Sequence, residues 1–127
     1  MKQYFYIPVG ILAAILGLSL WTGRYVDQRT EHWNMLLDQA DQAGQMELWD
    51  AAREQMDQIY RDWQGSQTCF HVILPHEELD KAEELFAGAF AMCREEDDAD
   101  FHQLLAQLMK QMELLAETQQ TSIQNIL

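Results

Sequence analysis

The sequence is poor in residues that break helices and in motifs that bind phosphate. Its 127 residues include two prolines and six glycines, and no group of glycines forms a phosphate-binding loop. No stretch alternates apolar and polar residues as a half-buried strand would. The length leaves room for one domain. These absences favour an all-α fold.

Basic residues and cysteines are also few. Six of the eight Lys and Arg and all 21 Asp and Glu lie after Val26, which gives that region a formal charge of −15. Such a surface repels phosphates, so we expect no nucleic-acid partner. If the chain reverses near Pro75, Cys69 and Cys93 lie about 18 Å apart, which is too far for a disulfide. Both are predicted to be free thiols.

One long apolar run stands out in this acidic chain. Residues 4–21 contain no charged residue. A helix from Tyr4 to about Val26 would cross the roughly 30 Å hydrocarbon core of a bilayer. The sequence therefore predicts a single transmembrane helix within residues 1–26, with residues 4–26 in contact with membrane lipid, followed by an acidic helical bundle domain over residues 27–127.

A cleaved signal peptide is the alternative interpretation of this run. Cleavage after Gly23 would require a small residue where the bulky Trp21 stands, which favours an uncleaved anchor. Lys and Arg flank the run almost equally, so the charge rule leaves the orientation open. The short N-terminal tail favours a single-pass protein of the cell membrane with its body outside the cytoplasm.

The chain contains four amphipathic segments, the first continuous with the membrane helix. They predict a small antiparallel bundle of about four helices in two hairpins. The first is expected to continue from the membrane helix to Ala43, with Gly44 as its stop. Gly65-Ser66 is expected to weaken or kink the second. The run from Cys69 to Leu74 is either the end of that helix or a packed connection. A shift of 52 residues places Trp49 on Phe101 and suggests a repeated hairpin.

The stretch Leu-Pro-His-Glu-Glu-Leu-Asp-Lys, residues 74–81, has two interpretations. His76, Asp80 and Glu83 could hold a divalent metal, with Asp98 or His102 as a further ligand. Half of the zinc-hydrolase motif is missing, since Asp80 stands where its second histidine would be. The start of a helix explains every residue, because proline and glutamate suit a first turn. We therefore predict a helix start, no catalytic or cofactor-binding residue, and metal ligation only as a weak alternative.

The remaining notable side chains also have plain explanations. The acidic run at residues 95–100 lacks the glycine of a calcium loop, and Asp97 or Asp98 is expected to cap the fourth helix. The three tryptophans of the body are predicted to lie in the core rather than in a ligand groove, and most of the methionines to fill the core. These residues are Trp33, Trp49, Trp63, Met35, Met46, Met56, Met92, Met109 and Met112.

Taken in order, these features resemble the bacterial domain of unknown function 4363, small membrane-anchored helical proteins of Gram-positive lineages. The resemblance rests on the anchor, Trp49-Asp50-Ala51-Ala52, Trp63, His76-Glu77-Glu78-Leu79-Asp80 and the final Ser122–Leu127 segment. Pro75 departs from the family pattern. The resemblance implies a single-pass helical protein with no assigned activity or cofactor.

Two functions follow from these observations. The first is a membrane-tethered, non-catalytic interaction or scaffolding module that binds a membrane protein or a second copy of itself, and we expect no enzyme. Its apolar tail, Ile123, Ile126 and Leu127, either docks on the bundle or is left for a partner. The second is a metal-dependent enzyme or metal sensor that uses the His76 cluster.

Overall fold

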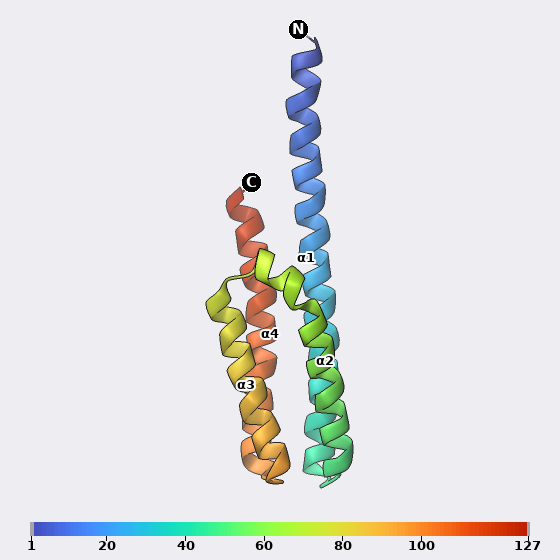
Figure 1. Cartoon of the computed structure of the whole chain (residues 1–127), viewed down its shortest axis with the longest axis vertical. Coiled ribbons are helices and arrows are strands. Elements are labelled where there is room, and N and C mark those ends of the chain that lie inside the picture. Colours follow the sequence, from blue (N-terminus) through green and yellow to red (C-terminus); the bar gives the residue numbers. More distant parts are fainter. Residues whose placement is uncertain (1, 127) are drawn as a thin grey trace.

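The computed structural model describes the backbone of residues 2–126 and the side chains of residues 6–119, and all the regular structure in this range is helical. The four helices pair as two antiparallel hairpins, with α1 against α2 and α4, and α3 against the same two helices (Figure 1). The predicted all-α bundle of two hairpins is confirmed. The helices are α1 (Lys2–Gln45), α2 (Trp49–Ile73), α3 (His76–Arg94) and α4 (Asp98–Ile126).

Helix α1 runs without a break through both predicted domains, and Val26 lies inside it. Its N-terminal part projects beyond the rest of the molecule (Figure 1). Every side chain from Tyr6 to Leu18 is exposed, whereas Val26 is fully buried in the bundle. The predicted order, an apolar N-terminal helix followed by a bundle, is therefore confirmed. The predicted tail residues Ile123, Ile126 and Leu127 lie outside the described side chains.

The core is built from one buried stripe on each helix. Trp33 and Trp63 are fully buried and Trp49 is nearly so, which confirms that the body's tryptophans are core residues. Their rings meet other aromatic rings edge to face, for example Trp33 and Trp63 with centroids 5.3 Å apart. Such contacts add to the stabilisation from burial.

The methionine prediction holds only in part. Met56 and Met112 are fully buried, and Met92 and Met109 pack partly against the core. Met35 and Met46 are 53% and 69% exposed, so these two do not fill the core. Met35 lies off the buried stripe of α1, and Met46 follows the end of that helix, where no neighbour covers it.

The first hairpin turn corrects the predicted helix stop. Helix α1 ends at Gln45, and the amide of Leu48 donates to the carbonyl of Ala43 at 2.8 Å. Glu47 takes the left-handed conformation that ends such helices, with φ 61°. Gly44 instead lies in the last turn of α1, where an added Cβ would come 2.9 Å from a ring carbon of Phe101. Glycine there allows α1 and α4 to approach closely.

The second hairpin turn repeats the first, with the left-handed residue at Glu96, φ 56°. The equivalent residues are thus 49 apart, not 52, and the predicted register is wrong. A shift of 49 residues also matches buried positions of α1 with buried positions of α3, and buried positions of α2 with buried positions of α4. The matched buried residues are Thr30, Trp33, Leu37 and Ala40 with Leu79, Ala82, Phe86 and Ala89, and Ala52, Met56, Ile59 and Trp63 with Phe101, Leu105, Leu108 and Met112.

Relief of this backbone strain gives a first prediction. A side chain in the left-handed region costs about 1 kcal/mol relative to glycine. We expect Glu47→Gly and Glu96→Gly each to raise the free energy of unfolding by about that amount, measured by chemical denaturation. Glu47→Ala is the control, because alanine keeps the Cβ. An equal gain in the alanine variant would show that charge, rather than backbone conformation, is responsible.

Helix α2 bends in its last third, where it turns away from α1 and crosses toward α3 (Figure 1). Gly65 and Ser66, where the sequence predicts a weakened or kinked helix, lie in this part of α2, and the Ser66 hydroxyl donates to the carbonyl of Asp62 at 3.2 Å. The run after Cys69 is helical as far as Ile73, which settles the question that the sequence left open. Cys69 is partly buried and the buried Cys93 lies on α3; both are free thiols.

Candidate functional site

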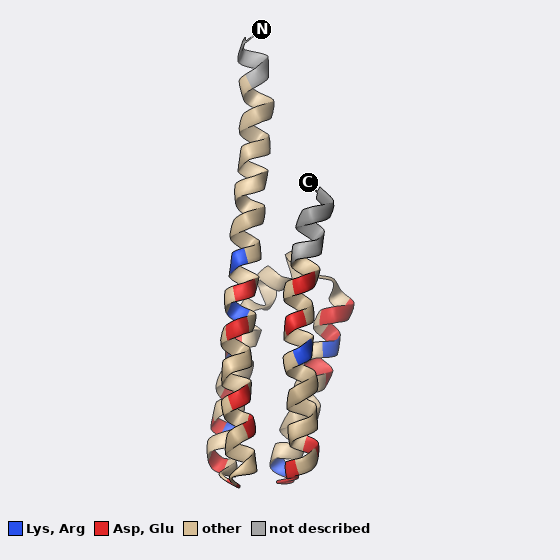
Figure 2. Ribbon diagram, turned by 180° about the vertical axis from the view of Figure 1, so that it is seen from behind, with Lys and Arg blue, Asp and Glu red and all other residues tan. Residues whose placement is uncertain are grey.

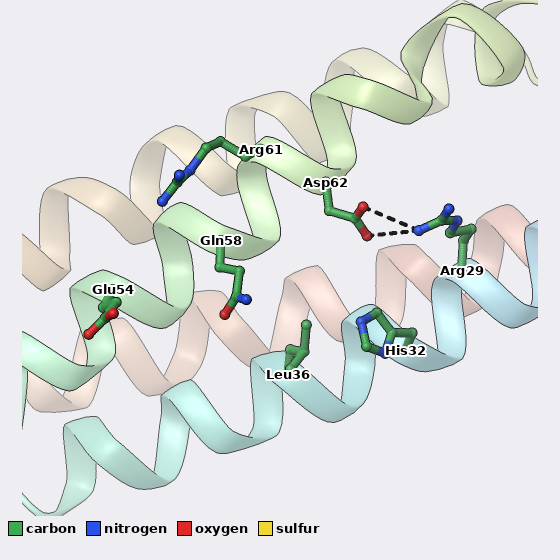
Figure 3. Close-up of a pocket in the computed structure, with 7 residues that line it drawn as sticks. All are labelled: Arg29, His32, Leu36, Glu54, Gln58, Arg61 and Asp62. Atoms are coloured by element: carbon green, nitrogen blue, oxygen red, sulfur yellow. Dashed lines mark hydrogen bonds and ion pairs between the residues drawn. The ribbon is translucent and has the colours of Figure 1, made fainter.

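An open groove of about 550 Å³ lies between α1 and α2. Charged and polar side chains of both helices line it, with one apolar side chain from α1 (Figure 3). Such a lining fits a polar surface of another protein better than an apolar small molecule. The lining residues are Arg29, His32 and Leu36 from α1, and Glu54, Gln58, Arg61 and Asp62 from α2.

The carboxylate of Asp62 organises one end of this groove. The Arg29 guanidinium donates to both of its oxygens at 3.2 Å, and the two groups face each other across the helices (Figure 3). The buried Trp33 indole also donates to it, at 2.7 Å. The guanidinium lies 5.5 Å from the centroid of the Tyr25 ring. Asp62 therefore fixes a core tryptophan and a surface arginine together.

The predicted metal candidates are not drawn together by the fold. Glu83 accepts a hydrogen bond from the Trp63 indole at 2.7 Å and one from the Tyr60 hydroxyl at 2.9 Å. The hydrogen bond to Glu83, followed by burial, raises the pKa of Tyr60. Asp80 is exposed on α3. Within residues 6–119, no three His, Cys, Asp or Glu side chains are arranged to hold a metal ion.

His76 has a partner that the sequence did not indicate. Its Nδ1 lies 3.1 Å from Nδ1 of His71, in the last turns of α2, and both rings are exposed. The chain reversal at Leu74-Pro75 brings the two imidazoles together. Helix α3 begins at His76, directly after Pro75 with φ −63°, so the predicted helix start is confirmed.

The acidic run before α4 acts as a cap. The Asp97 carboxylate accepts a hydrogen bond from the amide of Asp100 at 3.1 Å, and α4 begins at Asp98. The prediction of an aspartate cap is confirmed, with Asp97 in that role. The neighbouring charge of Asp97 raises the pKa of Asp100.

A buried carboxylate that sequence analysis missed is Asp41. It is 5% exposed on α1, and both of its oxygens lie 2.7 Å from Nδ1 of His102 on α4. The hydrogen bond and charge of Asp41 raise the pKa of His102. Only its place on the buried stripe beside Ala40 could have pointed to Asp41, and no pattern shows which helix faces it.

This pair makes the stability depend on pH. Because the folded state raises the pKa of His102, the stabilisation is full below the ordinary pKa of about 6.5 and fades as pH rises through the raised value. We expect His102→Gln to lower the melting temperature more at about pH 6 than at about pH 9. His32→Gln is the control for removing an exposed histidine. An equal loss at both pH values would contradict the assigned ion pair.

The thiol of Cys93 is placed for packing. Its burial raises its pKa, so it remains protonated at neutral pH and is a weak nucleophile. Its place in the repeat corresponds to Gly44, and both lie on buried stripes.

The exposed surface of α1 is the most unusual feature of the molecule. Described side chains such as Ile7, Leu12 and Leu18 are more than 60% exposed, in a helix long and apolar enough to cross a membrane. Charged residues are spread over the bundle, and none lies in the described part of α1 that projects beyond it (Figure 2). A soluble surface rarely shows such a continuous apolar patch.

Together these features define an antiparallel four-helix bundle whose first helix carries an exposed apolar extension. The family described as a domain of unknown function, DUF4363, matches residues 20–126, which is most of the chain. The protein therefore belongs to this family. The matched region begins near the end of the apolar run and includes the whole bundle. A search of curated proteins and a search of solved structures each gave no significant match.

Proposed function

We propose that this protein is a single-pass, membrane-anchored, non-catalytic interaction module. The N-terminal part of α1 lies in the lipid of the cell membrane, and the acidic bundle is held outside the cytoplasm. There it binds a membrane protein or a second copy of itself. The observation that carries the proposal is the continuous exposed apolar surface from Tyr6 to Trp21.

The continuity of α1 supports this arrangement. The same helix that leaves the proposed membrane span supplies the buried Val26, Trp33 and Leu37 to the core. The bundle therefore cannot turn freely relative to the anchor, as it could on a flexible linker. A fixed orientation suits a protein that presents one surface to a neighbour in the same membrane.

The groove between α1 and α2 is the surface we assign to the partner. A photo-crosslinking amino acid at Gln58 in the groove, and another at Gln103 on α4, test this in intact membranes; both positions are exposed. We expect a discrete crosslinked product at Gln58, containing a membrane protein or a second copy. No discrete product at either position would contradict an interaction module. A product at Gln103 alone would move the contact to α4.

The orientation has its own test. Protease added to intact cells should cut the bundle if it lies outside the cytoplasm, and cutting only after the cells are broken would reverse the assignment. Exposed helix ends such as Met46–Leu48 are the expected sites of cleavage.

The metal hypothesis retains one supporting observation, the His71–His76 contact. Two imidazoles supply two ligands, whereas catalytic zinc sites have three protein ligands. The test is the metal content of the purified protein with and without His76→Ala. Stoichiometric metal that the substitution removes would establish this function in place of the first.

A further inference from the structure

Three stretches without Asp, Glu, Lys or Arg meet at one end of the bundle. They are residues 3–23 of α1, residues 63–76 around the bend of α2, and residues 118–126 of α4. In a body with a charge of −15, long neutral stretches need an explanation. Figure 2 shows the charged positions on the bundle and none in the described part of α1 that projects beyond it.

Side-chain contacts fix these stretches at a common level. The Tyr25 hydroxyl donates to Ser66 at 3.4 Å, and its ring meets Phe70 edge to face with centroids 6.1 Å apart. Tyr25 also stacks on Trp21, the last aromatic residue of the apolar run. Gln119 of α4 donates to Thr22 at 3.3 Å. The bend of α2 therefore lies where α1 would leave the membrane.

The outward face of the bent segment is neutral. Phe70 and Leu74 turn into the core, whereas Val72 is 85% exposed. Thr68, His71 and Pro75 are exposed as well. These exposed side chains lie on the part of α2 that crosses toward α3 (Figure 1), and the other helices do not cover them. The segment combines a buried apolar side with an exposed side that has no fixed charge.

We propose that the bent end of α2 and the turn into α3, residues 64–76, lie in the headgroup region of the bilayer. This second membrane contact rests on the proposed anchoring by α1. A neutral segment fits that region, because anionic headgroups would repel an acidic one. Its exposed valine, Val72, favours the boundary between the headgroups and the acyl chains. The contact holds the bundle on the membrane surface and sets which of its faces remain open to partners.

Spin-label accessibility in the full chain tests this contact. The chain is placed in nanodiscs of phosphatidylcholine and phosphatidylglycerol. Only Cys69 is replaced by serine, since Cys93 is buried and is shielded from the label. A nitroxide is attached at Val72→Cys, with Met46→Cys at the opposite end as the control and Leu12→Cys as the reference for lipid. Circular dichroism of the Cys69→Ser protein checks the fold.

The relative accessibility to oxygen and to a water-soluble nickel chelate gives the result. We expect the labels at Leu12 and Val72 to favour oxygen, and the label at Met46 to favour the chelate. A Val72 label as open to the chelate as that at Met46, with Leu12 still in lipid, would overturn the second contact and leave the anchor standing. Low access to both reagents at Val72 would also overturn it, because a protein surface would then cover the site. Chelate access at Leu12 would remove the anchor itself.

Discussion

Replacing Trp63 with alanine is expected to lower the free energy of unfolding by about 3 to 5 kcal/mol. The indole is fully buried, and its ring centroid lies 5.3 to 5.8 Å from those of Trp33, Phe70 and Phe86. The substitution also removes the donor that Glu83 accepts at 2.7 Å. Chemical denaturation of the full chain in detergent, followed by circular dichroism, measures the loss.

Trp21→Ala is the matched control, because the same atoms are removed from a side chain that is 61% exposed. We expect it to change the free energy of unfolding by less than about 1 kcal/mol. Trp63→Phe keeps a buried aromatic ring but removes the indole N–H together with part of the ring, and we expect it to cost less than Trp63→Ala, about 1 to 3 kcal/mol. Equal losses in Trp63→Ala and Trp21→Ala would refute the core assignment.

The second large effect concerns the anchor. Arginine at the centre of a membrane span costs about 2.5 to 3.5 kcal/mol and leucine contributes about −0.3 to −0.6 kcal/mol, so Leu12→Arg with Leu16→Arg should cost about 6 to 8 kcal/mol of insertion free energy. Both leucines are exposed in the projecting part of α1. We expect the double variant to leave the membrane pellet after an alkaline carbonate wash.

Met35→Arg with Gln39→Arg controls for the added charge. These residues have the same spacing on the same helix, and both are exposed, but they lie in the bundle. This variant should remain in the pellet. If both double variants stay there, the apolar part of α1 is not what holds the protein to the membrane.

Much of the fold could be predicted from the sequence because it follows from local rules. The helical period of the apolar residues gave four helices, and aspartate before an apolar stripe gave the cap at Asp97. The turn residues that follow α1 and α3 could not be predicted, since glutamate is an unusual residue for the left-handed position that Glu47 and Glu96 occupy. In these turns, backbone hydrogen bonds and packing outweigh the preference for glycine.

The predicted register of the repeat was wrong for a different reason. The shift of 52 matched apolar residues at helical spacing and placed Trp49 on Phe101. In the structure these two rings contact each other, with centroids 5.5 Å apart, and so they are neighbours rather than equivalents. A single sequence cannot distinguish residues that correspond from residues that touch.

The candidate sites were the least predictable part, since they depend on which helix faces are paired. Spacing along one helix suggested that His76, Asp80 and Glu83 act together. In the fold, Glu83 instead accepts hydrogen bonds from Trp63 and Tyr60, and His76 contacts His71. The Asp41–His102 pair joins residues 61 apart in the chain, and no local pattern shows it.

Mass spectrometry of the protein that remains in carbonate-washed membranes tests the anchoring most directly. The exposed apolar part of α1 predicts an intact chain that still carries residues 1–26 and is found only in the membrane fraction. A chain that begins near Arg24 and is recovered in the soluble fraction would contradict the proposed tether, and with it the membrane contact of α2.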